Sequence, residues 1–189
     1  MPSANYDLGY LKTAVDLLRE YLLSDEIYWK LNVSSFPGEP AYPSLTLGGL
    51  LLARTRTRAR RLTPDQQVQF TQIVQKIDQL RTKWRSAWEK KSKSEYHARI
   101  NLWRDFVDDY RRNPDDNADR YAYEVSRRVM LQLLEIEIDE IPQSELILLS
   151  GLDGILAGLL TTGEFIWDDE LVSGFPRGEY PYLYGNLKG

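Results

Sequence analysis

The side chains most often used for catalysis and metal binding are scarce in this sequence. There is no cysteine, which excludes disulfides, thiolate nucleophiles and cysteine metal sites. The one histidine, His97, could serve as a metal ligand or general base, but a zinc site needs further histidine or cysteine ligands. We therefore predict that His97 is an exposed polar residue on a helix. We expect no catalytic residue, no metal site and no cofactor.

Carboxylates are numerous, but they lack the partners that common active sites require. Glu135, Asp139 and Glu140 fall on adjacent turns of an expected helix, and residues 168–170 form an acidic run. Such oxygens can bind Mg²⁺ or Ca²⁺. Di-iron bundles need Glu-x-x-His pairs, which do not occur here, and Gly48-Gly49 lacks the spacing and the lysine of a phosphate-binding loop. Solvated acidic faces are the simpler interpretation, and an enzyme is the less favoured one.

Positive charge is concentrated in the middle of the chain. Residues 54–99 hold 13 Lys and Arg and 4 Asp and Glu, a balance of +9, whereas the remaining residues hold 11 and 24, a balance of −13. Residues 134–179 contain 11 acids and one base, Arg177. We predict an interaction surface formed by an arginine row and by a cluster around an expected helical turn. These residues are Arg54, Arg56, Arg58, Arg60, Arg61, Lys83, Arg85, Lys90, Lys91, Lys93 and Arg99.

Two kinds of partner fit this basic surface. Lysine and arginine attract phosphates and exposed aromatic rings stack on bases, so it could contact RNA or DNA. The heptad phase places Trp84 in a packing seam and leaves Trp88 as the aromatic contact. Against nucleic acid, the sequence pI of 5.2 is well below the value above about 9 that is typical of dedicated nucleic-acid domains. We therefore favour a protein partner or self-association, including a dimer with complementary basic and acidic surfaces. The predicted function is that of a non-catalytic interaction or scaffold protein, with a metal- or ligand-binding bundle as a further alternative.

The elements that carry these residues are predicted to be helical. With 42% apolar and 28% charged residues, the 189-residue chain has a globular composition and the length of a single domain. A first helix is expected at residues 6–24, followed by a proline-rich loop at residues 32–44. Residues 44–62 fit a helix or a strand. One helix is preferred, because a strand there has no obvious partner.

A helical hairpin is predicted over residues 63–112. Thr63, Pro64 and Gln66 have the pattern of a capping box with proline at the first helical position. One heptad seam runs from Phe70 to Ala87, and a second, two residues out of phase, runs from Tyr96 to Tyr110. Neither a stutter nor a stammer gives that shift. We therefore predict two antiparallel helices with a turn near residues 90–94.

Two further helices, at residues 118–138 and 144–162, would complete an all-α bundle of about five to six helices. Gly151, Gly154 and Gly158 share one side of the last helix, which suggests that another helix backbone approaches closely there. Residues 163–189 are expected to be irregular.

We also expect a cytoplasmic protein without a membrane segment. The longest apolar stretch, residues 146–160, has about 15 residues, below the roughly 20 that a membrane-spanning helix needs. The first seven residues lack the basic and apolar regions of a signal peptide.

Two loops resemble each other. Residues 26–29 resemble residues 164–167, and residues 33–39 resemble residues 172–179 if two one-residue insertions are allowed. The shared aromatic and proline positions are Trp29, Phe36, Pro37 and Tyr42 in one loop and Trp167, Phe175, Pro176 and Tyr182 in the other. An internal repeat and a chance similarity both fit this pattern. In a true repeat, the loops would pack as structural ties between the ends of the chain.

Overall fold

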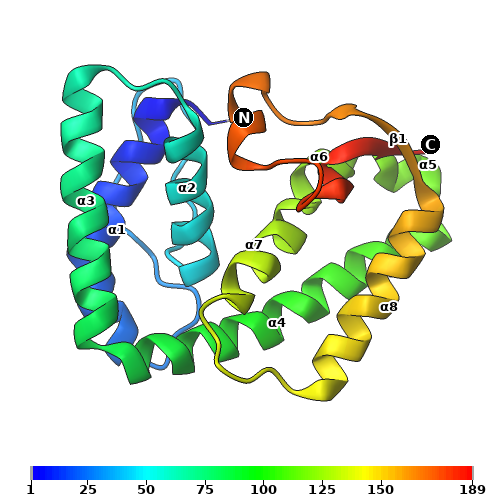
Figure 1. Cartoon of the computed structure of the whole chain (residues 1–189), viewed down its shortest axis with the longest axis horizontal. Helices are drawn as coiled ribbons and strands as arrows, with labels where there is room; N and C mark the ends of the chain where they lie inside the picture. Colours follow the sequence, from blue (N-terminus) through cyan, green and yellow to red (C-terminus); the bar gives the residue numbers. More distant parts are fainter. Residues whose placement is uncertain (1, 189) are drawn as a thin grey trace. The chain divides into compact units, whose positions relative to one another are not determined.

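The computed structural model describes residues 2–188, which form eight α-helices, three short 3-10 turns and a two-stranded sheet (Figure 1). The predominantly helical character is confirmed, while the predicted bundle and hairpin arrangement is not. The chain divides into two compact units, residues 1–95 and 96–189, called unit 1 and unit 2 below. A single domain spanning 1–189 stays a prediction.

Unit 1 is organised around helix α1, Ala4–Leu23, which packs against both α2 and α3 (Figure 1). Ser3 caps this helix, because its hydroxyl oxygen accepts a hydrogen bond from the Tyr6 amide at 3.1 Å. The apolar stripe predicted for the helix is confirmed, since all its members are buried. They are Leu8, Leu11, Val15, Leu18 and Leu22.

The segment with the ambiguous pattern is a helix, α2, Leu47–Ala59, as preferred from the sequence. Ala53, just before Arg54, and Thr57, between Arg56 and Arg58, are fully buried. They lie four residues apart and therefore share one helical face. Of the three small residues between the arginines, Thr57 therefore lies on the packed face of the helix, whereas Thr55 and Ala59 are half-buried. At the start of α2, both carboxylate oxygens of the buried Glu95 accept hydrogen bonds from the Gly48 amide, at 3.1 and 3.0 Å.

Helix α3, Pro64–Lys83, begins with the predicted capping box, in which Thr63 and Gln66 bond each other's backbone amides. The turn expected near residues 90–94 is wrong, because α4, Arg85–Arg112, runs through them without a break. Trp88, Ser92 and Tyr96 are buried at four-residue intervals, so the second seam begins earlier than the sequence suggested. The phase shift between the two seams is absorbed at Trp84, where α3 ends with φ −116° and ψ 36°.

The first part of unit 2 after α4 is a series of short helices. Helix α5, Pro114–Asn117, comes first. The single helix expected at residues 118–138 is instead divided into the 3-10 turn Ala118–Arg120, α6, Tyr121–Glu124, and α7, Ser126–Glu135. Helix α8, Gln143–Leu159, follows. A Cβ atom added to any glycine of its row would meet no described atom within 4 Å apart from the adjacent backbone of α8 itself, so the expected close approach of another helix is not observed.

The C-terminal part of unit 2, expected to be irregular, contains a small antiparallel sheet. Strand β1, Leu160–Phe165, pairs with β2, Tyr184–Leu187, and two 3-10 turns, Asp169–Gly174 and Pro181–Leu183, lie between them. Gly185, with φ 159°, permits the pairing, because a Cβ there would lie 2.3 Å from the Thr161 carbonyl oxygen. No helix in the described part of the chain has the length and apolar character to cross a membrane.

Candidate ligand-binding site

The arginine row predicted as an interaction surface is largely bound inside unit 1. Asp7 is fully buried and accepts hydrogen bonds from Arg56 at 3.1 and 2.5 Å and from Arg60 at 2.5 Å. Arg54 forms an ion pair with Asp78 at 3.0 Å. These three arginines connect α2 with α1 and α3. Their guanidinium groups are thus already bound within unit 1, and a contact of these residues with a partner stays a prediction.

Lys91 and Trp88 are also placed differently from the prediction. The Lys91 ammonium donates to the carbonyl oxygens of Ser24 and Glu26, at 2.7 and 2.8 Å, just beyond the end of α1. Burial of this side chain lowers the pKa of Lys91. Trp88 is only 2% exposed and cannot stack on a base, and Arg99 is buried as well. Because α4 continues through residues 90–94, Trp88, Lys91 and Arg99 lie on one helix, where all three are buried.

The other predicted basic residues remain at the surface. Lys93 pairs with Glu89 on the same helix at 2.7 Å, and Lys90 lies 3.6 Å from Asp25. The exposed members of the predicted set are Arg58, Arg61, Lys83, Arg85, Lys90 and Lys93.

His97 is exposed on α4, as predicted. Its Nδ1 atom lies 2.6 Å from a carboxylate oxygen of Glu145, at the start of α8. Among residues 2–188, no group of three or more histidine, aspartate and glutamate side chains could hold a metal ion. This pair therefore connects two helices of unit 2 at the surface.

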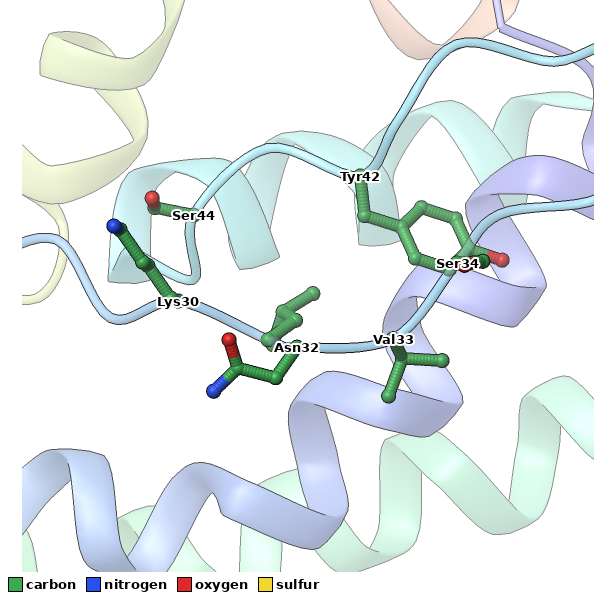
Figure 2. Close-up of a pocket in the computed structure, with 7 residues that line it drawn as sticks. Lys30, Asn32, Val33, Ser34, Tyr42 and Ser44 are labelled. Atoms are coloured by element: carbon green, nitrogen blue, oxygen red, sulfur yellow. The ribbon is translucent and has the colours of Figure 1, made fainter.

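Unit 1 has a hollow of about 320 Å³ between the two legs of the loop that follows α1 (Figure 2). Backbone hydrogen bonds between Trp29 and Leu45, at 3.0 and 2.7 Å, close the base of the loop. The Tyr42 ring extends from one leg towards Ser34 on the other, and Lys30 is the one charged residue in the lining (Figure 2). Because a single exposed loop supplies the whole lining, this hollow is the weaker candidate for a ligand site.

The two similar loops are anchored in a comparable way, each within its own unit. The Tyr6 hydroxyl donates to the Ala41 carbonyl at 3.0 Å, and the Tyr121 hydroxyl donates to the Tyr182 carbonyl at 2.6 Å. Their aromatic residues differ in packing, since Phe36 is 50% exposed and its counterpart is fully buried. An internal repeat therefore stays a prediction.

A larger hollow, of about 470 Å³, lies in unit 2. Helices α7 and α8, both strands and the C-terminal loop supply its lining, which is mostly apolar. The lining residues are Arg128, Gln132, Asp153, Leu156, Ala157, Leu160, Thr162, Arg177, Gly178, Glu179, Pro181, Tyr182 and Tyr184. We call it the α8 hollow.

An ion pair between α7 and α8 lines the α8 hollow. Arg128 donates two hydrogen bonds to Asp153, from Nε and Nη2, both at 2.8 Å. The Arg128 guanidinium also lies 4.9 Å from the centre of the Tyr182 ring. The Arg128 side chain is only 10% exposed, whereas the Asp153 side chain is 36% exposed. Two parallel bonds and a stacked ring fix the geometry of this pair.

A chain of hydrogen bonds connects the C-terminal loop, residues 177–183, with α7. The Tyr182 hydroxyl donates to the Gln132 side-chain oxygen at 2.6 Å, and the Gln132 amide donates to the Glu179 carbonyl at 3.1 Å. Burial raises the pKa of Tyr182, so its hydroxyl remains a neutral donor at physiological pH. These bonds give the α8 hollow fixed walls without any ligand.

Arg177 lies on the exposed rim of the α8 hollow. It donates from Nη2 to the Gly163 carbonyl oxygen at 2.7 Å, and its guanidinium lies 4.7 Å from the centre of the Tyr184 ring. It forms no ion pair with any residue that the structure describes. The sequence identified Arg177 as the one base among residues 134–179, but no pattern connected it with Arg128 or Asp153. The isolation of Arg177 among acidic residues was the one sequence feature that pointed to this site.

The arrangement of the α8 hollow is suited to noncovalent binding. Ligand pockets are typically apolar hollows of about 300–1,000 Å³ with a few fixed polar groups. Its ion pair, its tyrosine and its rim arginine are each held by hydrogen bonds to neighbouring elements. Comparisons of this chain with protein-family models, with curated proteins and with solved structures gave no match.

Proposed function

We propose that this chain is a binding protein and that the α8 hollow holds a small ligand. The observation that carries the proposal is a mostly apolar hollow of about 470 Å³ whose polar groups are held by their own hydrogen bonds. Preorganised walls lower the cost of ordering side chains on binding. The proposal concerns binding alone and assigns no reaction to the site.

A neutral fluorescent probe, N-phenylnaphthylamine, tests this proposal. We expect the wild-type chain to bind the probe with saturable fluorescence enhancement. Ala157→Phe should remove this binding, because residue 157 lines the hollow and is itself exposed. Ser150→Phe adds the same side chain to an exposed position of α8 outside the lining and should leave binding unchanged. Equal binding by wild type and Ala157→Phe would contradict the proposal.

Self-association through complementary charge is a second candidate function. The charge segregation follows the division into units, since residues 1–95 hold 15 Lys and Arg and 10 Asp and Glu, a balance of +5. Residues 96–189 hold 9 and 18, a balance of −9. Unit 1 of one copy could therefore attract unit 2 of another. Contact with nucleic acid receives less support, because Trp88 and Lys91 are buried and three arginines of the row, Arg54, Arg56 and Arg60, are bound to carboxylates of unit 1.

Sedimentation equilibrium at low and high salt tests the second candidate. We expect a dimer or larger species that dissociates when salt rises from about 20 mM to about 500 mM, because screening shortens the range of charge attraction. Arg58→Glu combined with Arg61→Glu should weaken this association, since both side chains are exposed. A monomer under all these conditions would exclude self-association. Salt-sensitive binding of mixed DNA or RNA at about 50 mM salt would favour the nucleic-acid interpretation instead.

A further inference from the structure

We propose that the ligand of the α8 hollow is a small amphiphilic anion, an apolar body that carries one carboxylate group. This inference rests on the proposed function, because it names the chemistry of a ligand for the same hollow. It depends on which charges in the lining are already neutralised and which are not.

The ion pair in the lining contributes no net charge. Arg128 and Asp153 are joined by two hydrogen bonds of 2.8 Å, and each satisfies the other's charge. A ligand with a net charge would therefore gain little from this pair as a whole. The pair also keeps the buried Arg128 cation from requiring a ligand anion of its own.

Arg177 is the lining cation that forms no ion pair with a described carboxylate, whereas Arg128 is paired with Asp153. One of its nitrogen atoms is bound to the Gly163 carbonyl and its guanidinium lies beside the Tyr184 ring, so the group is held in place. A guanidinium has five N–H donors, and the structure records a hydrogen bond from only one Arg177 nitrogen to a described residue. The remaining donors match the fork geometry of a carboxylate.

Apolar side chains supply most of the remaining lining. Leu156 and Leu160 contribute from α8 and β1, and Pro181 and Tyr184 contribute from the C-terminal segment. An alkyl or aromatic body would bury apolar surface against these residues. Glu179, an exposed acid in the same lining, opposes an anion, so its charge should reduce the affinity.

Octanoate and octanol test the inference, because they share one apolar chain and differ in the charged group. Each is used to displace N-phenylnaphthylamine from the wild type and from two variants of exposed residues. We expect octanoate to bind the wild type about fivefold to tenfold more tightly than octanol, the range expected for one charge-assisted contact at an exposed arginine. Arg177→Gln should remove this difference, and Glu179→Gln should enlarge it. Octanol binding should stay the same in all three chains.

The outcomes separate the inference from the function on which it rests. Equal displacement by octanoate and octanol, with or without Arg177, would overturn the anionic ligand while leaving a binding hollow. An octanoate preference that survives Arg177→Gln would overturn the role of Arg177. Probe binding that is insensitive to Ala157→Phe would instead refute the binding function of the hollow. Circular dichroism of each variant checks that the fold is retained.

Discussion

Removal of the Asp7 carboxylate by Asp7→Asn should destabilise unit 1. Asp7 is fully buried and holds two arginines that lie 49 and 53 residues away in the chain. The substitution preserves the size of the side chain and removes its charge. Two guanidinium groups then lose the carboxylate that compensates them.

The expected loss follows from the burial of these partners. Breaking a buried ion pair by removing one partner costs about 3–5 kcal/mol. The Arg56 side chain is 13% exposed and can regain some water, whereas the Arg60 side chain is 1% exposed and cannot. We therefore expect a loss of about 3 kcal/mol or more, a large part of a typical folding free energy of about 5–15 kcal/mol.

Urea unfolding followed by circular dichroism measures the total loss, and hydrogen exchange of individual peptides assigns it to unit 1. Asp16→Asn is the matched control, because Asp16 lies on the same helix and its exposed carboxylate is 3.5 Å from the Lys76 ammonium. We expect this control to lose less than about 1 kcal/mol. Equal stability of the two variants would refute the structural role of the buried cluster. Recovery of stability on replacing all three cluster residues with apolar side chains would support it.

Three further predictions concern two glycines and the buried tyrosines. Gly9→Ala should destabilise unit 1 and loosen the loop after α1, because the added Cβ would lie 2.2 Å from the Tyr42 hydroxyl oxygen. Gly151→Ala should instead stabilise the chain by up to about 1 kcal/mol, since the added Cβ would meet no described atom within 4 Å apart from the adjacent backbone of α8. The urea midpoint should therefore fall for Gly9→Ala and rise for Gly151→Ala. Burial raises the pKa of Tyr121 and Tyr182 in the folded chain, so the unfolded chain loses these protons first. Stability should therefore fall as the pH rises above about 10, and an unchanged urea midpoint between pH 9 and pH 11 would contradict this.

Local patterns in the sequence predicted the helices of unit 1 well. The apolar stripe of α1 and the capping box of α3 depend on residues within one or two turns, so the sequence contains all the information needed. The break between the two helices lies at Trp84, but the sequence placed it near residues 90–94. The buried Trp88 belongs to the second seam, and this became clear only from the continuous helix α4.

The features that the sequence did not predict depend on contacts between residues far apart in the chain. The arginine row looked like a surface because Asp7, its main partner, is far away in the sequence. The strands were missed because β1 follows α8 directly, with no turn signal, and pairs with a strand near the end of the chain. The α8 hollow joins Arg128, Asp153 and Arg177 from three separate elements, and no local pattern predicts that combination.

NMR mapping of a bound probe would show whether the α8 hollow is a ligand-binding site. Isotope-labelled chain would be titrated with N-phenylnaphthylamine while backbone amide shifts are followed. We predict that the shifts cluster in α7, α8 and residues 177–184, and that Ala157→Phe abolishes them. Shifts confined to the loop at residues 30–44, or scattered over the chain, would contradict binding in the α8 hollow.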